Sequence, residues 1–234
     1  FDSEQITTET SLATYDTTIE TFTPRQGEIK NYPDVYYIVL DAYTGSSSLK
    51  KFLNYDNQKF VSYLTNKGFN VNHKSYSNYP STEYSVISTL NMIYLNFLTE
   101  EKDGYQEFHL PYRMYEENIV MQNFKSVGYK VIIIDKPLTS QSLQVSSSLF
   151  DLELCKRNKY VDTELFSQMI KTSILVLLLE KWEEHEMREA TLCAFSELPK
   201  QHQKFDEPVF VYSHLLIPHP PYLFGPEGEP VSSV

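Results

Sequence analysis

The feature that most constrains the fold is a short apolar run, Val35 to Leu40, which ends in a single acidic residue, Asp41. β-Branched and aromatic residues dominate the run, as is typical of a buried β-strand. In open α/β sheets, ligands bind in the crevice beyond the carboxyl ends of the strands. A strand that ends in Asp41 therefore predicts a carboxylate placed as a ligand at that edge of a sheet.

Two further apolar runs extend this pattern. Tyr129 to Asp135 (YKVIIID) is the clearest central strand, and it follows a helical pattern over Glu116 to Ser126 that Gly128 ends. Another strand is expected at Val209 to Ser213. Helix, glycine and strand in this order predict βαβ units, so we expect an α/β fold with a mainly parallel sheet flanked by helices.

The remaining elements are expected from weaker periodicity. Short helices are predicted at Leu49 to Leu53 and Asn57 to Lys67, and a weakly alternating strand at Phe69 to Tyr76. Two more helices are predicted near the C-terminus, at Asp162 to His185 and Met187 to Glu197. Residues 137–160 are rich in serine, and their pattern predicts no element.

The segment NYPSTEYSVISTLNM places two hydroxyl side chains at the expected start of a helix. Ser81 and Thr82 follow Pro80, and the helix should run from Glu83 to about Tyr94. Ser81 is expected to be the N-cap residue. Helix N-termini carry unpaired N–H groups and a positive partial charge, which suit phosphate or sulfate. An ordinary first-turn role is the alternative interpretation of Thr82.

Composition limits the class of protein and of partner. Apolar and aromatic contents of 41% and 14% indicate a globular chain. The formal net charge of −11, from 31 acidic and 20 basic residues, argues against nucleic acid as a partner. It also argues against docking on anionic lipid through a general basic field. An anionic substrate remains compatible, because a bound metal ion can reverse the local field.

The domain organisation is expected to be simple. Residues 1–31 are polar and read as a linker or arm, and residues 32–234 as one α/β domain. The chain starts at Phe1 without a methionine or signal peptide, so we expect it to be part of a longer protein. Cys155 and Cys193 are too few for a disulfide framework; they are either a pair in an extracytoplasmic domain or two buried thiols.

Three segments together resemble the alkaline phosphatase/sulfatase superfamily. They are YYIVLDAY around Asp41, STEYSV around Thr82, and FVYSHLLIPHPPYLF, which contains His214 and His219. The STEYSV segment is especially similar to the nucleophile segment of phosphoethanolamine transferases, and more distantly to that of lipoteichoic acid synthases. The third segment is similar to the His-x-Pro segment of sulfatases and of these transferases.

The resemblance implies a fold and a set of roles. It implies an alkaline-phosphatase-like sheet, in which Asp41 and Thr82 bind a divalent metal (zinc, manganese, magnesium or calcium). Thr82 is then the nucleophile that forms a covalent intermediate, with Ser81 as the fallback. His219 is expected to hold the phosphate or sulfate of the substrate. It also implies an extracytoplasmic enzyme whose membrane anchor lies outside this chain.

The other candidate residues have ordinary structural alternatives. His214, at the end of a predicted strand, is a second candidate for substrate binding, although a histidine there often only satisfies a backbone group. Lys74 and Tyr84, which flank the nucleophile segment, are further candidate substrate contacts.

The chain departs from the family in its metal ligands. Members complete the site with an Asp-His pair after the His-x-Pro segment, and this chain contains no Asp-His dipeptide. We therefore expect an incomplete domain that binds metal weakly and is inactive alone. The Cys-x-Pro-x-Arg segment of formylglycine sulfatases is also absent. The alternative function is a non-catalytic module of the same fold that binds a polyanion or a protein partner.

Overall fold

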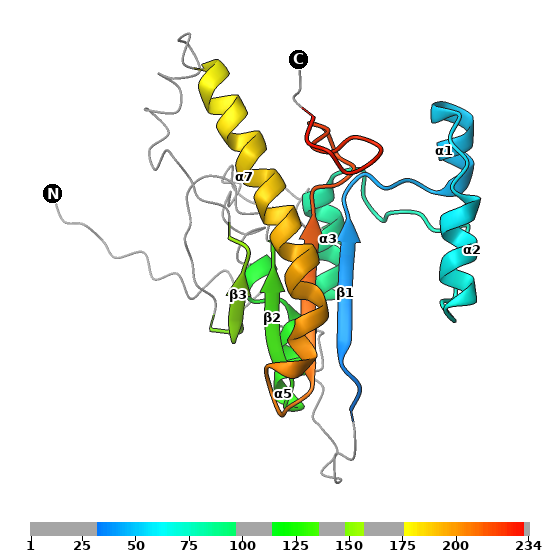
Figure 1. The fold of residues 1–234 in the computed structure, drawn as a ribbon. Helices are drawn as coiled ribbons and strands as arrows, with labels where there is room; N and C mark the ends of the chain where they lie inside the picture. Colours follow the sequence, from blue (N-terminus) through cyan, green and yellow to red (C-terminus); the bar gives the residue numbers. More distant parts are fainter. Residues whose placement is uncertain (1–31, 97–113, 136–147, 157–175, 232–234) are drawn as a thin grey trace, which may run out of the picture.

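The computed structural model describes residues 32–96, 114–135, 148–156 and 176–231 (Figure 1). Within them, four parallel strands form one sheet in the order β1-β4-β2-β3. The strands are β1 (Val35–Leu40), β2 (Lys130–Ile134), β3 (Leu152–Leu154) and β4 (Val209–Leu215). The predicted α/β fold with a parallel sheet is therefore confirmed.

Helices cover both faces of this sheet. Figure 1 shows α7 crossing one face, with α3 and α5 on the other. The helices are α1 (Ser46–Leu53), α2 (Gln58–Asn66), α3 (Thr82–Asn91), α5 (Ile119–Ser126) and α7 (Val176–Glu197), and a 3-10 helix follows at Leu198–Gln203.

The strand residues alternate between two apolar layers. On the α3/α5 side, Val131, Phe210 and Tyr212 pack in one cluster with residues of both helices. On the α7 side, Ile132 and Val211 pack in the other. All seven residues of β4 are buried, because the strand lies between β1 and β2 and is covered on both faces. Such two-sided burial explains why a parallel strand reads as a continuous apolar run.

Local signals set the ends of the helix that precedes β2. The Asn118 side chain caps α5 by accepting a hydrogen bond from the backbone N–H of Met121 at 2.9 Å. After the helix, Gly128 has φ +93°, the left-handed conformation that glycine adopts at little cost. The chain thus turns from α5 directly into β2, as the sequence predicts.

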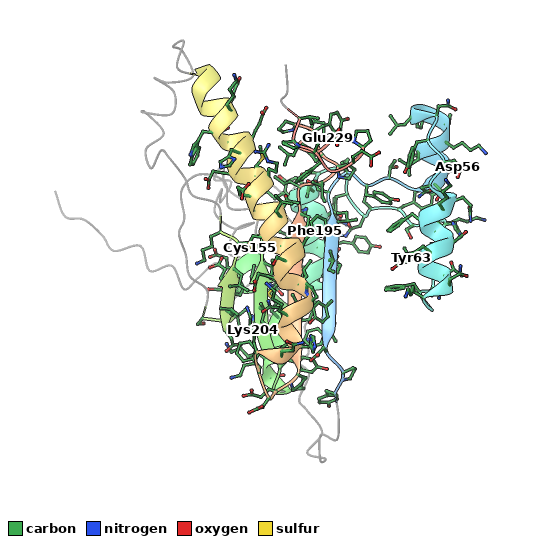
Figure 2. All side chains as sticks on the ribbon, viewed as in Figure 1. Asp56, Tyr63, Cys155, Phe195, Lys204 and Glu229 are labelled. Atoms are coloured by element: carbon green, nitrogen blue, oxygen red, sulfur yellow. A yellow bond between two sulfur atoms is a disulfide. The ribbon has the colours of Figure 1, made fainter. Side chains whose placement is uncertain are left out.

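Residues 43–78, which we call the α1–α2 insertion, lie between β1 and α3. In Figure 1 the two helices stand apart from the sheet beside β1, and Figure 2 shows Asp56 and Tyr63 on this outlying pair. Tyr43 joins the insertion to the end of β1, because its backbone N–H donates to the carbonyl of Leu40 at 3.3 Å. Within the insertion, its hydroxyl accepts a hydrogen bond from Asn57 Nδ2 at 3.1 Å and its ring contacts Phe60. At the other end of the insertion, Asn78 Nδ2 donates to Ser88 Oγ at 2.8 Å, and Asn78 Oδ1 accepts from Ser85 Oγ at 2.6 Å.

Two sequence expectations on elements are wrong. The strand predicted at Phe69 to Tyr76 is irregular chain, since both of these aromatic side chains are exposed and have no buried face on which to alternate. The short strand β3 lies within residues 137–160, where no element was predicted. It consists of three half-buried residues paired with β2, too short a run for a periodic signal. The break predicted between the helices at Asp162 to His185 and Met187 to Glu197 is also wrong, because α7 continues through Glu186 as one helix. Residues 162–175 of the first predicted helix lie outside the described residues.

A disulfide links β3 to α7. Cys155 follows the end of β3 and is bonded to Cys193 of α7, 38 residues further along the chain. Figure 2 labels Cys155 between the sheet and the helix. Of the two alternatives left open by the sequence, the paired cysteines are the ones found. Within the described residues, no helix is both long and apolar enough to cross a membrane. The predicted arm, residues 1–31, lies outside the described residues.

Candidate functional site

Asp41 stands at the carboxyl end of β1, as predicted. Its backbone N–H donates to the carbonyl of Leu215 at 2.9 Å, which continues the pairing of β1 with β4 by one residue. The next residue, Ala42, has φ +61°, so the chain turns sharply away from the sheet. Only 13% of the Asp41 side chain is exposed. The hydrogen bond to Leu215 therefore fixes the backbone of Asp41, and the carboxylate is held at the edge of the sheet.

Thr82 meets Asp41 across the start of α3. Thr82 is the first residue of the helix, and its Oγ1 donates a hydrogen bond to Oδ1 of Asp41 at 3.2 Å. The two residues are 41 positions apart in the sequence. The resemblance implies that both belong to one site, and the structure brings their side chains together.

Ser81 occupies the predicted N-cap position, with extended backbone angles, but its side chain makes no capping hydrogen bond. The N-cap position is therefore as predicted, although the Ser81 hydroxyl does not cap the helix. What distinguishes Thr82 from Ser81 is the hydrogen bond of Thr82 to a carboxylate.

His214 adds an imidazole to this pair. It is fully buried in β4, in register with Val39, and its Nε2 lies 3.8 Å from Oδ2 of Asp41. Two residues earlier, burial raises the pKa of Tyr212, and the charge of Asp41 also contributes. The second candidate histidine thus lies beside the first candidate metal ligand, facing α3.

Asp135 is a site residue that sequence analysis missed. It follows β2 directly, is fully buried, and its carbonyl accepts a hydrogen bond from the backbone N–H of His214 at 3.3 Å. It lies one residue beyond the strand and has φ +48°, so its contact with His214 is made by the backbone carbonyl. The signal was present, since YKVIIID ends in an acid just as YYIVLD does.

Three other candidate residues have surroundings unlike those of the residues above: His219, Lys74 and Tyr84. His219 is exposed in the loop after β4, and its Nδ1 is within hydrogen-bonding distance of the Pro220 carbonyl. Lys74 is exposed in the α1–α2 insertion, and the Tyr84 ring packs edge-on against Tyr79. No contact among those found in the described residues joins any of the three to Asp41 or Thr82.

The donor atoms fit part of a metal site. A carboxylate, a hydroxyl and an imidazole are ligand types used for zinc or manganese, and oxygen donors suit magnesium and calcium. Asp41 and Thr82 offer two oxygens within hydrogen-bonding distance, and His214 offers a nitrogen close by. In the part of the chain that the structure describes, no three His, Cys, Asp or Glu side chains are grouped so that they could hold a metal ion. These residues therefore supply part of a ligand set.

No family model, no curated protein and no solved structure matches the chain.

Proposed function

We propose that the chain belongs to a metal-dependent enzyme of the alkaline phosphatase/sulfatase type. It would hydrolyse or transfer a phosphate or sulfate ester through a covalent intermediate on Thr82. The observation that carries the proposal is the hydrogen bond from Thr82 Oγ1 to Asp41 Oδ1, which joins a helix-start hydroxyl to a strand-end carboxylate. This is the pair of residue types to which the sequence resemblance assigns the nucleophile and the metal ligand.

The residues of this chain would divide the chemistry between them. Asp41 orients the Thr82 hydroxyl, and Oγ1 forms a bond to phosphorus or sulfur as the ester bond breaks. The hydroxyl proton leaves along the hydrogen bond toward Asp41 and ends on the departing alkoxide. In the second step, an oxygen of water or of an acceptor alcohol takes the group from Thr82, and its proton returns to Oγ1.

The N-terminus of α3 suits the anionic part of such a substrate. Thr82, Glu83 and Tyr84 have backbone N–H groups in the first turn, where a helix has no internal acceptor for them. The positive end of the helix dipole favours a phosphoryl or sulfuryl group there. A divalent metal held by Asp41 and Thr82 would lower the pKa of the hydroxyl and offset the charge of the ester.

The proposal also covers the acceptor of the transferred group and the compartment in which the protein is located. Water as the acceptor would make the protein a hydrolase, and a lipid or glycan hydroxyl would make it a transferase. The disulfide between Cys155 and Cys193 supports an extracytoplasmic domain, since such bonds persist in oxidising compartments. A membrane anchor outside this chain would hold the domain at the membrane.

A second candidate is a non-catalytic module of the same fold that binds a polyanion or a protein. It is favoured by one observation: among the described residues, the ligand types near Asp41 number too few for a complete metal centre. Such a module would keep the anion-binding helix start and have no turnover.

The experiment is an activity screen on the full-length protein with aryl phosphate monoesters, aryl phosphate diesters and aryl sulfates. Each is tested with zinc, manganese, magnesium or calcium, and with a chelator. We expect metal-dependent release of the aryl alcohol, which Thr82→Ala abolishes and Glu83→Gln keeps. Turnover that persists in Thr82→Ala would overturn the covalent mechanism. Anion binding without any turnover would support the non-catalytic module.

A further inference from the structure

The α1–α2 insertion exposes most of its large apolar side chains. Within its two helices, only Leu49 and Val61 are buried. Phe52 is 72% exposed and Tyr76 91%. The others exposed in the same stretch are Tyr43, Leu53, Tyr55, Phe60, Tyr63 and Phe69. A concentration of exposed aromatic and aliphatic side chains marks an interaction surface, whereas single exposed residues need no explanation.

The same stretch is basic, although the protein is acidic. Residues 43–78 contain one acidic residue, Asp56, against a total of 31 in the chain. All of their lysines are exposed: Lys50, Lys51, Lys59, Lys67 and Lys74. The local charge is therefore opposite in sign to the net charge of −11.

Lysines and rings share this surface. The Lys51 ammonium lies over the Phe52 ring at 4.9 Å from its centroid, and the Lys67 ammonium over the Tyr63 ring at 5.8 Å. The cations are thus interleaved with the apolar groups.

This combination identifies the kind of partner. Protein–protein interfaces are depleted in lysine, because burying the ammonium is costly. A second copy that docked through its own α1–α2 insertion would also bring like charges together. At a bilayer surface, in contrast, rings enter the headgroup region while lysine side chains reach anionic lipid headgroups. We propose that the α1–α2 insertion docks the protein on a membrane surface that contains anionic lipid.

The position of the insertion gives the docking a consequence. Its two ends connect to Asp41 and Thr82, the residues that hydrogen-bond at the edge of the sheet. Docking through α1 and α2 would therefore hold that edge close to lipid headgroups. The inference depends on exposure and charge alone, so it would survive if the proposed chemistry failed.

The test is vesicle flotation with the whole chain. We expect the protein to float with vesicles of phosphatidylcholine mixed with phosphatidylglycerol, and not with phosphatidylcholine alone. Binding should fall as salt is raised, because the lysine contribution is screened. Absence of flotation with the mixed vesicles at low salt would overturn the proposal.

Two sets of variants test the surface itself. One neutralises Lys51, Lys59 and Lys67 to glutamine; at about fivefold per lysine, binding should weaken on the order of 100-fold. The other changes Phe52, Tyr63 and Phe69 to serine and should also abolish flotation. Because all six side chains are exposed, the melting temperature should not change.

Matched controls change the same number of groups elsewhere. The control for the lysine variant changes three residues to glutamine: Lys156, Lys181 and Lys200. The control for the aromatic variant changes three residues to serine: Tyr94, Phe195 and Tyr222. All six side chains are exposed. The controls should bind vesicles as the wild type does. Equal loss in the controls, or none in the insertion variants, would overturn the proposal. The proposal would also be overturned if the wild type bound no vesicles but formed a dimer that the aromatic variant dissociated.

Discussion

The hydroxyl of Thr82 donates to the carboxylate of Asp41 at 3.2 Å, although the α1–α2 insertion separates the two residues in the sequence. The contact is formed by the two elements that enclose the insertion, since Asp41 ends β1 and Thr82 begins α3. Packing of α3 on the sheet through Val86, Ile87 and Leu90 fixes the distance. The insertion can therefore serve another purpose without disturbing the pair.

The first prediction separates Thr82 from its neighbour. Thr82→Ala should remove nearly all turnover of the full-length protein, because the two-step path loses its acceptor. Ser81→Ala should keep most activity, and it should cost less than the roughly 0.5–2 kcal/mol of a lost N-cap, since the Ser81 side chain makes no capping hydrogen bond. Kinetics and denaturant unfolding of both variants give the comparison.

The location of the adduct checks the same assignment directly. A slow substrate should leave a phosphate or sulfate on the peptide that contains both residues, and fragmentation should place it on Thr82. A modified Ser81 would show that the hydrogen bond to Asp41 does not mark the nucleophile.

The second prediction concerns metal binding. Residues 1–234 should bind zinc, manganese or calcium weakly, because Asp41, Thr82 and His214 supply only part of a ligand set. The full-length protein should bind more tightly if further ligands lie beyond Val234. Titration calorimetry on both measures this, with Asp41→Asn as the variant that should abolish the difference. Tight stoichiometric binding by residues 1–234 would contradict the prediction.

The positions of Asp41 and Thr82 could be predicted from sequence because each residue sits at a local boundary, while their place at one site was implied by the resemblance. A strand end and a helix start are readable from periodicity and from Pro80, and both belong to elements that pack together in an α/β fold. The parallel sheet followed from the same signals.

The rest of the site depends on strand order, which the sequence does not encode locally. His214 reaches Asp41 only because β4 lies next to β1, and Asp135 approaches His214 only because β2 lies on the other side of β4. His219 carried the more recognisable motif, but an exposed loop positions it, and loop geometry is weakly specified by pattern.

The third prediction tests Asp135 as a residue that positions His214. Asp135 has φ +48°, a left-handed conformation that asparagine tolerates and alanine disfavours. Asp135→Ala should lose about 1–2 kcal/mol more stability than Asp135→Asn because of this backbone conformation. If the carboxylate orients the imidazole, Asp135→Asn should lower kcat and leave KM unchanged. Equal stability of the two variants would show that the backbone at 135 relaxes.

The fourth prediction is an acid dependence at the end of α7. Hydrogen bonds from Lys200 and Lys204 lower the pKa of Glu197 to about 2. The folded pKa lies below the ordinary value of 4.5, so this contribution to stability is present above pH 4.5 and is lost as the pH falls toward 2. The melting temperature of Glu197→Gln should therefore approach that of the wild type over this range. A variant with both lysines changed to glutamine should also approach the melting temperature of the wild type over this range. A difference in melting temperature that stays constant down to pH 2 would contradict the pairing.

The last prediction concerns the bond between Cys155 and Cys193. It closes a loop of 38 residues between β3 and α7, and such a bond restricts the unfolded chain. Replacing both cysteines with serine should lower the free energy of unfolding by about 2–4 kcal/mol. Adding a reductant to the wild type should give a similar loss, and adding it to the double variant should change nothing. Peptide mapping without reduction should find the two cysteines in one linked pair. Recovery of both as alkylated thiols from protein secreted through an oxidising compartment would show that the bond does not form.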